Sequence, residues 1–72
     1  MKYKIGTLIT AKSKNKRTEV MAIVTEYDEA HRIYVLKFLR TYDGVEESWQ
    51  ETSVGAKQLE GWENDHGYKF TK

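Results

Sequence analysis

The 72-residue sequence predicts a small all-β barrel of about five short antiparallel strands, with one helical turn before the last strand. Two observations carry this prediction. Apolar residues follow a period of two over most of the chain, as expected for half-buried strands. β-Branched and aromatic residues concentrate in the same stretches. The length, residues 1–72, holds one domain whose core is only just large enough to offset the entropy of folding.

Two strands joined by a polar loop are predicted in the first part of the chain. The first strand is expected over residues 6–12, and the polar run 13–18 ends it. The second strand is expected over residues 19–27. Its continuous apolar run, residues 20–24, is typical of a strand that is covered on both faces. Residues 28–31 then turn the chain.

The third strand, predicted over residues 32–40, is apolar on both faces. One face would carry Tyr34, Leu36 and Phe38, and the other would carry Ile33, Val35 and Leu39, with Lys37 among them. Because a single layer around a small core leaves one of these sets outward, we expect a protein interface there, formed by self-association or by docking on another protein. The alternative is that barrel coiling, together with Tyr68 and Phe70, covers this face.

A tight hairpin is predicted after the third strand. Asp43-Gly44 is the strongest hairpin signal in the chain, because both residues tolerate the positive φ of a turn between twisted strands. The fourth strand is expected over residues 45–51. It would turn Val45 and Trp49 inward and otherwise present charges, which is typical of an edge strand.

The last third of the chain predicts one helical turn and a final strand. Residues 53–59 are too short for a stable helix but suit a single turn with Leu59 directed inward. The last strand is expected to include Trp62. Residues 66–70 either extend that strand or pack across the barrel as a tail.

The predicted layout has a polar first loop and a helical turn before the last strand. Six short motifs are placed along it. They are Ile5-Gly6-Thr7-Leu8, Ile23-Val24-Thr25-Glu26, Tyr34-Val35-Leu36-Lys37-Phe38, Asp43-Gly44, Glu47-Ser48-Trp49 and Gln58-Leu59-Glu60. Over about residues 5–63 the chain thereby resembles SH3-like and Tudor-like small barrels, including small uncharacterised proteins of tailed phages. Residues 64–72 would form a strand extension or tail. The resemblance implies binding of RNA, DNA, methylated side chains or peptides, and the fold alone selects none of these.

Two departures from the SH3-like pattern concern the middle of the chain. The glycine that commonly opens the second strand is absent, and the link from Phe38 to Asp43 is longer than usual. We therefore expect the third strand to bulge or protrude.

Catalytic and metal-binding constellations are absent from the sequence. The chain has no cysteine, no clustered histidines and no glycine-rich phosphate loop, so we expect no enzyme activity, no cofactor, no metal site and no small-molecule substrate. The acidic pairs Asp28-Glu29 and Glu46-Glu47 fit a solvated turn and a charged edge strand better than a cation site. His31 and His66 stand alone, and we expect both to be exposed rather than to be ligands.

Cellular location is predicted from the same composition. Apolar runs of five residues or fewer cannot cross a bilayer, and the first residues lack the apolar stretch of a signal peptide. The absence of cysteine gives no sign of an oxidising compartment. We therefore expect a cytoplasmic protein, in the host cell if phage-encoded, with no membrane partner.

Basic residues gather near the start of the chain and favour an anionic partner. Residues 1–22 carry six lysines and arginines against one glutamate, a net charge of +5, while the remainder carries −4. Two tyrosines that flank turns could stack with bases beside the basic loop. The expected nucleic-acid contacts are Lys12, Lys14, Lys16, Arg17, Tyr27 and Tyr42. Lys2 and Lys4 could join them on one side of the barrel. The alternative is that these lysines only keep a small domain soluble, since the overall charge is far from that of a dedicated nucleic-acid binder.

Four other aromatic residues are expected to fill the core of the barrel. They are Tyr34, Phe38, Trp49 and Trp62. The sequence thus leads to two hypotheses for a non-enzymatic binding module. One is contact with nucleic acid or nucleoprotein through the basic loop, and the other is protein interaction or assembly through the apolar face of the third strand.

Overall fold

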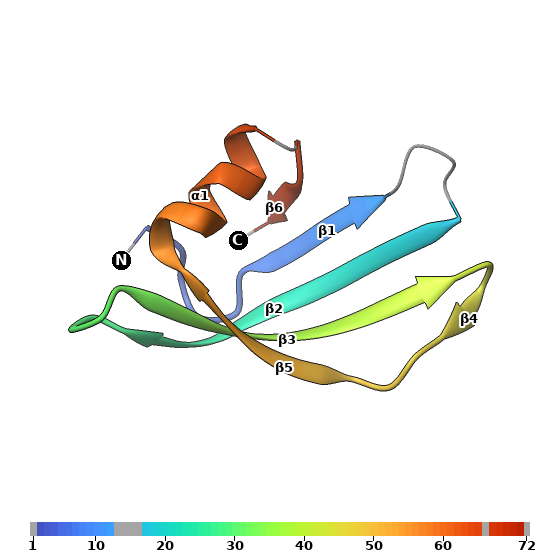
Figure 1. Ribbon diagram of the computed structural model, residues 1–72, viewed down its shortest axis with the longest axis horizontal. Coiled ribbons are helices and arrows are strands. Elements are labelled where there is room, and N and C mark those ends of the chain that lie inside the picture. Colours follow the sequence, from blue (N-terminus) through green and yellow to red (C-terminus); the bar gives the residue numbers. More distant parts are fainter. Residues whose placement is uncertain (1, 13–16, 66, 72) are drawn as a thin grey trace.

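A computed structural model describes residues 2–12, 17–65 and 67–71 of the chain (Figure 1). These residues form six strands and one helix. The elements are β1 (Leu8–Lys12), β2 (Thr18–Asp28), β3 (Ile33–Tyr42), β4 (Val45–Glu46), β5 (Gln50–Gly55), α1 (Ala56–Asn64) and β6 (Lys69–Thr71). The prediction of a mostly antiparallel β fold is therefore confirmed.

All six strands belong to one antiparallel sheet. Its order is β4-β3-β2-β1-β6, and β5 pairs with β3 on the same edge as β4. The predicted fourth strand is thus divided into β4 and β5 by residues 47–49. The final strand β6 returns to β1, where Leu8 lies opposite Thr71. Among the described strands no pairing joins β6 to β4 or β5, so the sheet is open and the predicted closure of a barrel is not seen.

The β3–β4 hairpin forms where the sequence predicts it. Asp43 and Gly44 have φ values of 49° and 81°, and Tyr42 lies opposite Val45 across the turn. Positive φ at both central residues matches the right-handed twist of the flanking strands. The Asp43 amide also donates to the carbonyl of Arg17 at 2.8 Å, which ties this hairpin to the start of β2.

The irregularity expected in the third strand lies instead in β2. Val24 is opposite Leu36 but Glu26 is opposite Val35, so Thr25 is an extra residue. The Thr25 hydroxyl donates to the Val35 carbonyl at 3.2 Å. An extra residue shifts the inside–outside alternation by one position. As a result Tyr27 pairs with Tyr34 and turns toward the core, which an unbroken strand would prevent.

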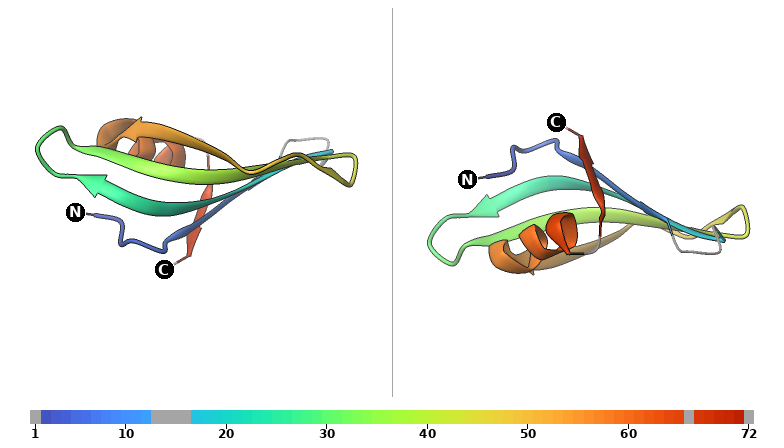
Figure 2. Two further views of the ribbon diagram at one scale, coloured as in Figure 1. Left: turned by 90° about the horizontal axis from the view of Figure 1, so that it is seen from below. Right: turned by 90° about the horizontal axis from the view of Figure 1, so that it is seen from above.

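The core lies between one face of the sheet and α1. Its buried residues include Leu59 of α1, which is fully enclosed, and they are Tyr3, Ile9, Ala22, Val24, Tyr34, Leu36, Val54 and Leu59. Figure 2 shows α1 on one side of the sheet only. The predicted helical turn is in fact a nine-residue helix. It contains Trp62, so the expectation of Trp62 in a strand is wrong, although its expected core packing is confirmed.

The first residues of the chain close one end of this core. Tyr3 is buried against Phe70 and Tyr34, with ring centroids 4.7 and 5.6 Å apart. Its hydroxyl donates to Glu63 of α1 at 3.0 Å. Burial, together with the hydrogen bond to Glu63, raises the pKa of Tyr3 well above its ordinary value. The predicted core, residues 5–63, therefore omits a fully buried residue that closes one of its ends.

Helix α1 is not stabilised by its own ends. Gly55 is its N-cap and supplies no side-chain hydrogen bond, and the first turn contains no acidic residue. Lys57 occupies that turn, while Glu63 and Asp65 lie at the other end, which opposes the helix dipole. The helix therefore depends on the burial of its apolar side chains against the sheet.

A serine at Gly55 is expected to raise the free energy of unfolding by about 0.5 kcal/mol, because φ of −63° and ψ of 148° suit a capping hydroxyl. A Cβ at this position meets no atom within 4 Å. The matched control is Gly44→Ser, which should lower stability by about 1 kcal/mol because φ is positive there. Urea unfolding of both variants measures the difference. Equal effects at the two glycines would contradict the geometry described for the cap and the turn.

Candidate functional site

The sheet face opposite α1 carries a second set of apolar side chains. Residues opposite one another in an antiparallel sheet share a face, and the register places six of them here. This set, called the open face below, is Leu8, Met21, Ile23, Ile33, Val35 and Leu39. It includes all three residues predicted as a protein interface, namely Ile33, Val35 and Leu39. None of the six belongs to the core cluster beneath α1.

Burial is uneven among the apolar residues of the open face. Leu39 is only 8% exposed, whereas Met21 directly opposite it is 38% exposed. The other four residues are half-buried. No described helix lies on this face, as Figure 2 shows. One apolar face of β2 and β3 therefore packs in the core, and the other forms an apolar band that no described helix covers.

The sheet projects beyond α1 as an arm, formed by the ends of β1, β2 and β3 together with β4 (Figure 1). Exposed large apolar residues concentrate on the arm and on the link after it: Met21, Tyr42, Val45 and Trp49 are 38%, 51%, 69% and 51% exposed. The predictions that Trp49 fills the core and that Val45 turns inward are therefore wrong. Val45 pairs with Tyr42 on the arm, beyond the part of the sheet that α1 covers, and Trp49 lies among residues 47–49, which do not pair with β3.

A shallow hollow of about 680 Å³ lies on the arm. Met21 and Leu39 of the open face line it together with charged residues from four strands. The full lining is Thr10, Ala11, Lys12, Glu19, Val20, Met21, Leu39, Thr41, Glu46, Gly67, Tyr68 and Lys69. An apolar floor with a charged rim is the usual anatomy of a protein-binding surface.

Charged residues of both signs lie on the open-face side of the sheet. Lys12 of β1 and Lys69 of β6 lie on this face at one edge. Glu46 of β4 and Glu51 of β5 lie on it at the other edge. Between these edges the apolar residues are interspersed with four further charged residues, which are Glu19, Glu26 and Asp28 of β2 and Lys37 of β3.

The basic segment predicted to bind nucleic acid is partly neutralised. The Lys12 amine lies 3.6 Å from Glu19, and the Arg17 guanidinium lies 3.8 Å from Asp43. All four side chains are more than half exposed, so each ion pair contributes little to holding its two side chains in place. Lys14 and Lys16 lie outside the described residues.

The remaining predicted contacts are divided between the two ends of the molecule. Tyr42 is opposite Thr18, next to Arg17, and therefore lies at the tip of the arm. Tyr27 packs against Tyr34 at 4.5 Å and is part of the core at the other end. Lys2 also lies at that end, with its amine 3.7 Å from Glu63. The structure therefore places Lys12, Arg17 and Tyr42 on the arm, with Lys12 and Tyr42 on opposite faces of the sheet, and separates Tyr27 and Lys2 from them.

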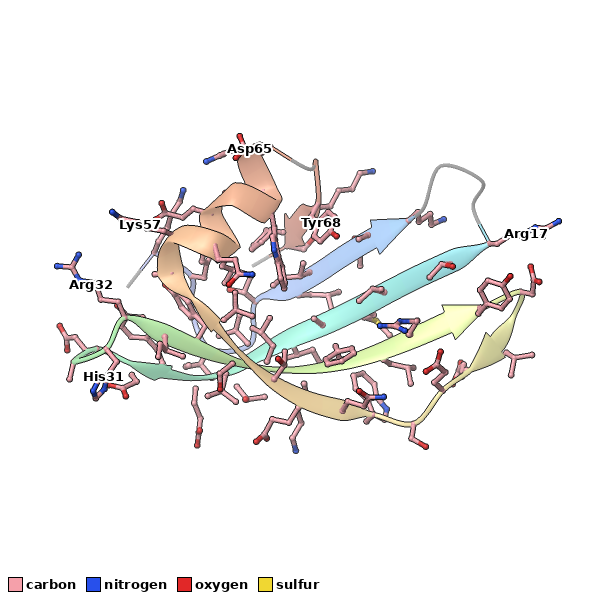
Figure 3. The ribbon with its side chains drawn as sticks, viewed as in Figure 1. Arg17, His31, Arg32, Lys57, Asp65 and Tyr68 are labelled. Atoms are coloured by element: carbon pink, nitrogen blue, oxygen red, sulfur yellow. The ribbon has the colours of Figure 1, made fainter. Side chains whose placement is uncertain are left out.

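The tip of the arm contains one cation that the sequence did not single out. Arg40 lies opposite Val20, on the same face as Tyr42 and on the reverse side from Met21 and Leu39. Both Arg40 and Tyr42 are exposed. The predicted third strand ended at residue 40, whereas β3 continues to Tyr42. Alternation along the longer strand would have shown that Arg40 and Tyr42 share a face. Figure 3 shows Arg17 at this end and Arg32 and Lys57 at the opposite end.

The opposite end of the molecule has a second hollow, of about 840 Å³, between the β2–β3 turn and the start of α1. Its lining mixes both charges: Lys2, Tyr27, Glu29, His31, Arg32, Tyr34, Gly55, Ala56, Lys57 and Glu60. In the turn, the His31 ring lies 2.8 Å from a carboxylate oxygen of Asp28. That hydrogen bond lowers the pKa of Asp28 below its ordinary value. Among the described residues no buried side-chain polar atom lacks a partner, so nothing in this hollow demands a ligand.

The described residues contain neither a metal-binding cluster nor a helix that could span a membrane. The described residues contain no group of three or more metal-binding side chains, and Asp28-Glu29 and Glu46-Glu47 form no such cluster. The predicted exposure of His31 is confirmed, while His66 lies outside the described residues. No helix in the described ranges has the length and apolar character needed to span a bilayer.

No protein-family model matches this chain, and comparisons with curated proteins and with solved structures gave no match.

Proposed function

We propose that this chain is a non-enzymatic protein-interaction module that binds its partner through the open face. The observation that carries the proposal is the apolar band on the sheet face that α1 leaves uncovered. On a sheet with one solvated face, the residues of that face are expected to be polar. Here Met21 and Ile23 of β2 are both apolar, as are Ile33, Val35 and Leu39 of β3.

The residue types of this surface favour a protein partner over a nucleic acid. Methionine and aromatic residues are enriched in protein interfaces, and charged residues form the rim. Met21 and Trp49 are exposed on or beside the arm, while Lys12 is paired with Glu19 in the same chain. A surface with charges of both signs gives little non-specific attraction to phosphates.

A photo-crosslinking amino acid tests the open face in the native cell. It replaces Met21 in one variant and Lys57, an exposed residue of α1, in the matched control. We expect a protein adduct from position 21 and none from position 57. The purified adduct partner should then bind the wild-type chain and bind the Leu39→Glu variant more weakly. No adduct, or equal adducts from both positions, would contradict the proposal.

A second candidate function is contact with nucleic acid at the tip of the arm. The specific observation is that the exposed side chains of Arg40 and Tyr42 share a face next to Arg17. A cation beside an exposed ring combines phosphate contact with base stacking. Retention on single-stranded oligonucleotides should fall steeply between about 50 and 200 mM salt and should be lost in an Arg17→Ala, Arg40→Ala double variant. No retention at the lower salt would remove this candidate.

The proposed relationship to SH3-like barrels concerns the connection of the strands. It is supported by the order of elements, in which five antiparallel strands precede a helix, β4 and β5 both pair with β3, and the last strand returns to β1. The arrangement would be an open variant, with α1 in the place of a helical turn. We propose that the chain acts in the cytoplasm as a binding module of this type.

A further inference from the structure

We infer that the free edge of β5 pairs with β5 of a second copy of this chain, antiparallel about a two-fold axis between the two Thr52 residues. The pairing joins the two sheets into one continuous sheet. It goes beyond the proposed function, because it uses the edge of the sheet and leaves the open face of each copy available. Three properties of β5 support it, which are its length, the direction of its backbone groups and its register against itself.

β5 is the longest free edge among the described strands. It pairs with β3 on one side only, and no described strand lies beyond it (Figure 1). The other strands at the edges of the sheet, β4 and β6, have two and three residues, whereas β5 has six. Short strands, lysine and proline commonly protect a sheet edge from pairing with another chain. β5 contains neither lysine nor proline, and its one charged residue, Glu51, lies opposite Lys37 of β3.

The backbone groups of Glu51 and Ser53 are directed away from β3. The Ala56 amide donates to the Arg32 carbonyl at 2.8 Å, and the register continues this ladder to Thr52. In an antiparallel pair every second residue bonds to the neighbouring strand, and the residues between them turn their N–H and C=O groups outward. Glu51 and Ser53 are two such residues, and both are exposed. Within the described part of the chain no backbone hydrogen bond engages them on the outer side.

One antiparallel register of β5 against itself satisfies these outward groups. It places Glu51 of each copy opposite Ser53 of the other, which forms four backbone hydrogen bonds around the axis. Sliding the strands one way would put Glu51 directly opposite its own counterpart, where like charges repel. Sliding them the other way would pair Glu51 with Gly55, whose carbonyl is engaged by α1 because Gly55 is the N-cap.

The side chains are compatible with the same register. Glu51 and Ser53 lie on one face of the sheet, so the Ser53 hydroxyl of each copy can donate to the Glu51 carboxylate of the other. The two Glu51 side chains are diagonal rather than direct neighbours, and each lies opposite Lys37 of its own chain. A two-fold axis perpendicular to a sheet keeps each face on its own side. The open faces of the two copies therefore lie side by side on one surface.

Single-cysteine crosslinking tests this register, because the chain contains no cysteine. In the inferred pair the two Thr52 Cα atoms lie about 4.5 Å apart, as in other pairs without mutual hydrogen bonds, and a disulfide spans that distance. Thr52→Cys should therefore give a covalent dimer under mild oxidation. Gln50→Cys is the matched control on the same face of β5. It should give none, because residue 50 lies opposite residue 54, four residues or about 13 Å along the strand from its counterpart.

Sedimentation equilibrium from low micromolar to millimolar concentration measures the non-covalent association. We expect the wild-type chain to dimerise. Ser53→Pro should dimerise about tenfold or more weakly, because it removes an outward amide from each copy and places a ring against the incoming strand. Proline is tolerated on an edge strand where the amide it replaces faces solvent, so this variant should stay folded, which circular dichroism checks. Ser53→Ala keeps the amide, serves as the matched control and should dimerise much as the wild type does.

A wild-type chain that stays monomeric at millimolar concentration would overturn the second-copy inference. So would a folded Ser53→Pro variant that dimerises like the wild type, or a disulfide that forms as readily at position 50 as at position 52. If Ser53→Pro does not fold, the comparison of positions 50 and 52 decides. These outcomes are distinct from failure of the proposed function. A monomer that still gives a position-21 adduct with another protein would leave the interaction module standing, whereas a β5 dimer without that adduct would support the pairing and remove the proposed function.

Discussion

A Leu59→Ala substitution is expected to lower the free energy of unfolding by about 2–5 kcal/mol. Leu59 is the single fully buried residue of α1 and fills the space between the helix and the sheet. Its loss leaves a cavity that the surrounding strands can only partly close. The effect is large for this chain, because small domains are stable by only about 5–15 kcal/mol in total.

Urea unfolding followed by tryptophan fluorescence measures this change, since Trp62 lies in the same helix. Lys57→Ala is the matched control, because it shortens an exposed side chain of α1 and should change stability by less than about 0.5 kcal/mol. A loss at position 59 as small as that at position 57 would contradict the packing of α1 on the sheet. A selective loss at position 59 would support it.

A Tyr34→Phe substitution is expected to destabilise the chain by about 1–3 kcal/mol. The Tyr34 hydroxyl accepts hydrogen bonds from the backbone amides of Lys2 and Tyr3, at 3.1 and 3.2 Å. Phenylalanine keeps the ring contacts with Tyr3 and Tyr27 but removes the acceptor. Since Tyr3 is buried, its amide would lose its partner without gaining water.

Hydrogen exchange at the Tyr3 amide, measured beside urea unfolding, gives a local readout for this substitution. The amide should exchange faster in Tyr34→Phe than in the wild type. Tyr27→Phe is the matched control, because Tyr27 is a partly buried ring beside Tyr34 and its hydroxyl makes no contact with these amides. Unchanged exchange in Tyr34→Phe would contradict the role of the hydroxyl in holding the first residues on the core.

The strands and the tight hairpin were predictable because their signals are local. Alternation of side chains located β1, β2 and β3, and Asp43-Gly44 supplied the positive φ of the turn. The helix was underestimated because Gly55 gives a poor cap and the charges of α1 oppose its dipole. What stabilises α1 is burial of Leu59 and Trp62 against strands that lie far away in the sequence, which local patterns do not contain.

The candidate site was predictable only in part, for the same reason. Ile33, Val35 and Leu39 do share the uncovered face, because alternation along one strand fixes their relation to each other. The pairing of Lys12 with Glu19 depends on the register between β1 and β2, and that of Arg17 with Asp43 depends on the approach of two loops. The inward turn of Tyr27 depends on Thr25 staying out of the β2–β3 ladder, which no local pattern reveals.

That extra residue, Thr25, can be lost without changing the pairing on either side of it. Its deletion would make Val24 and Glu26 neighbours, opposite Leu36 and Val35, which are already neighbours on β3. Tyr27 would stay opposite Tyr34 and keep its inward turn, because a regular strand places it on the same face as Val24. In genetic terms, natural variants of this chain should therefore tolerate the loss of the Thr25 codon as well as different side chains at position 25.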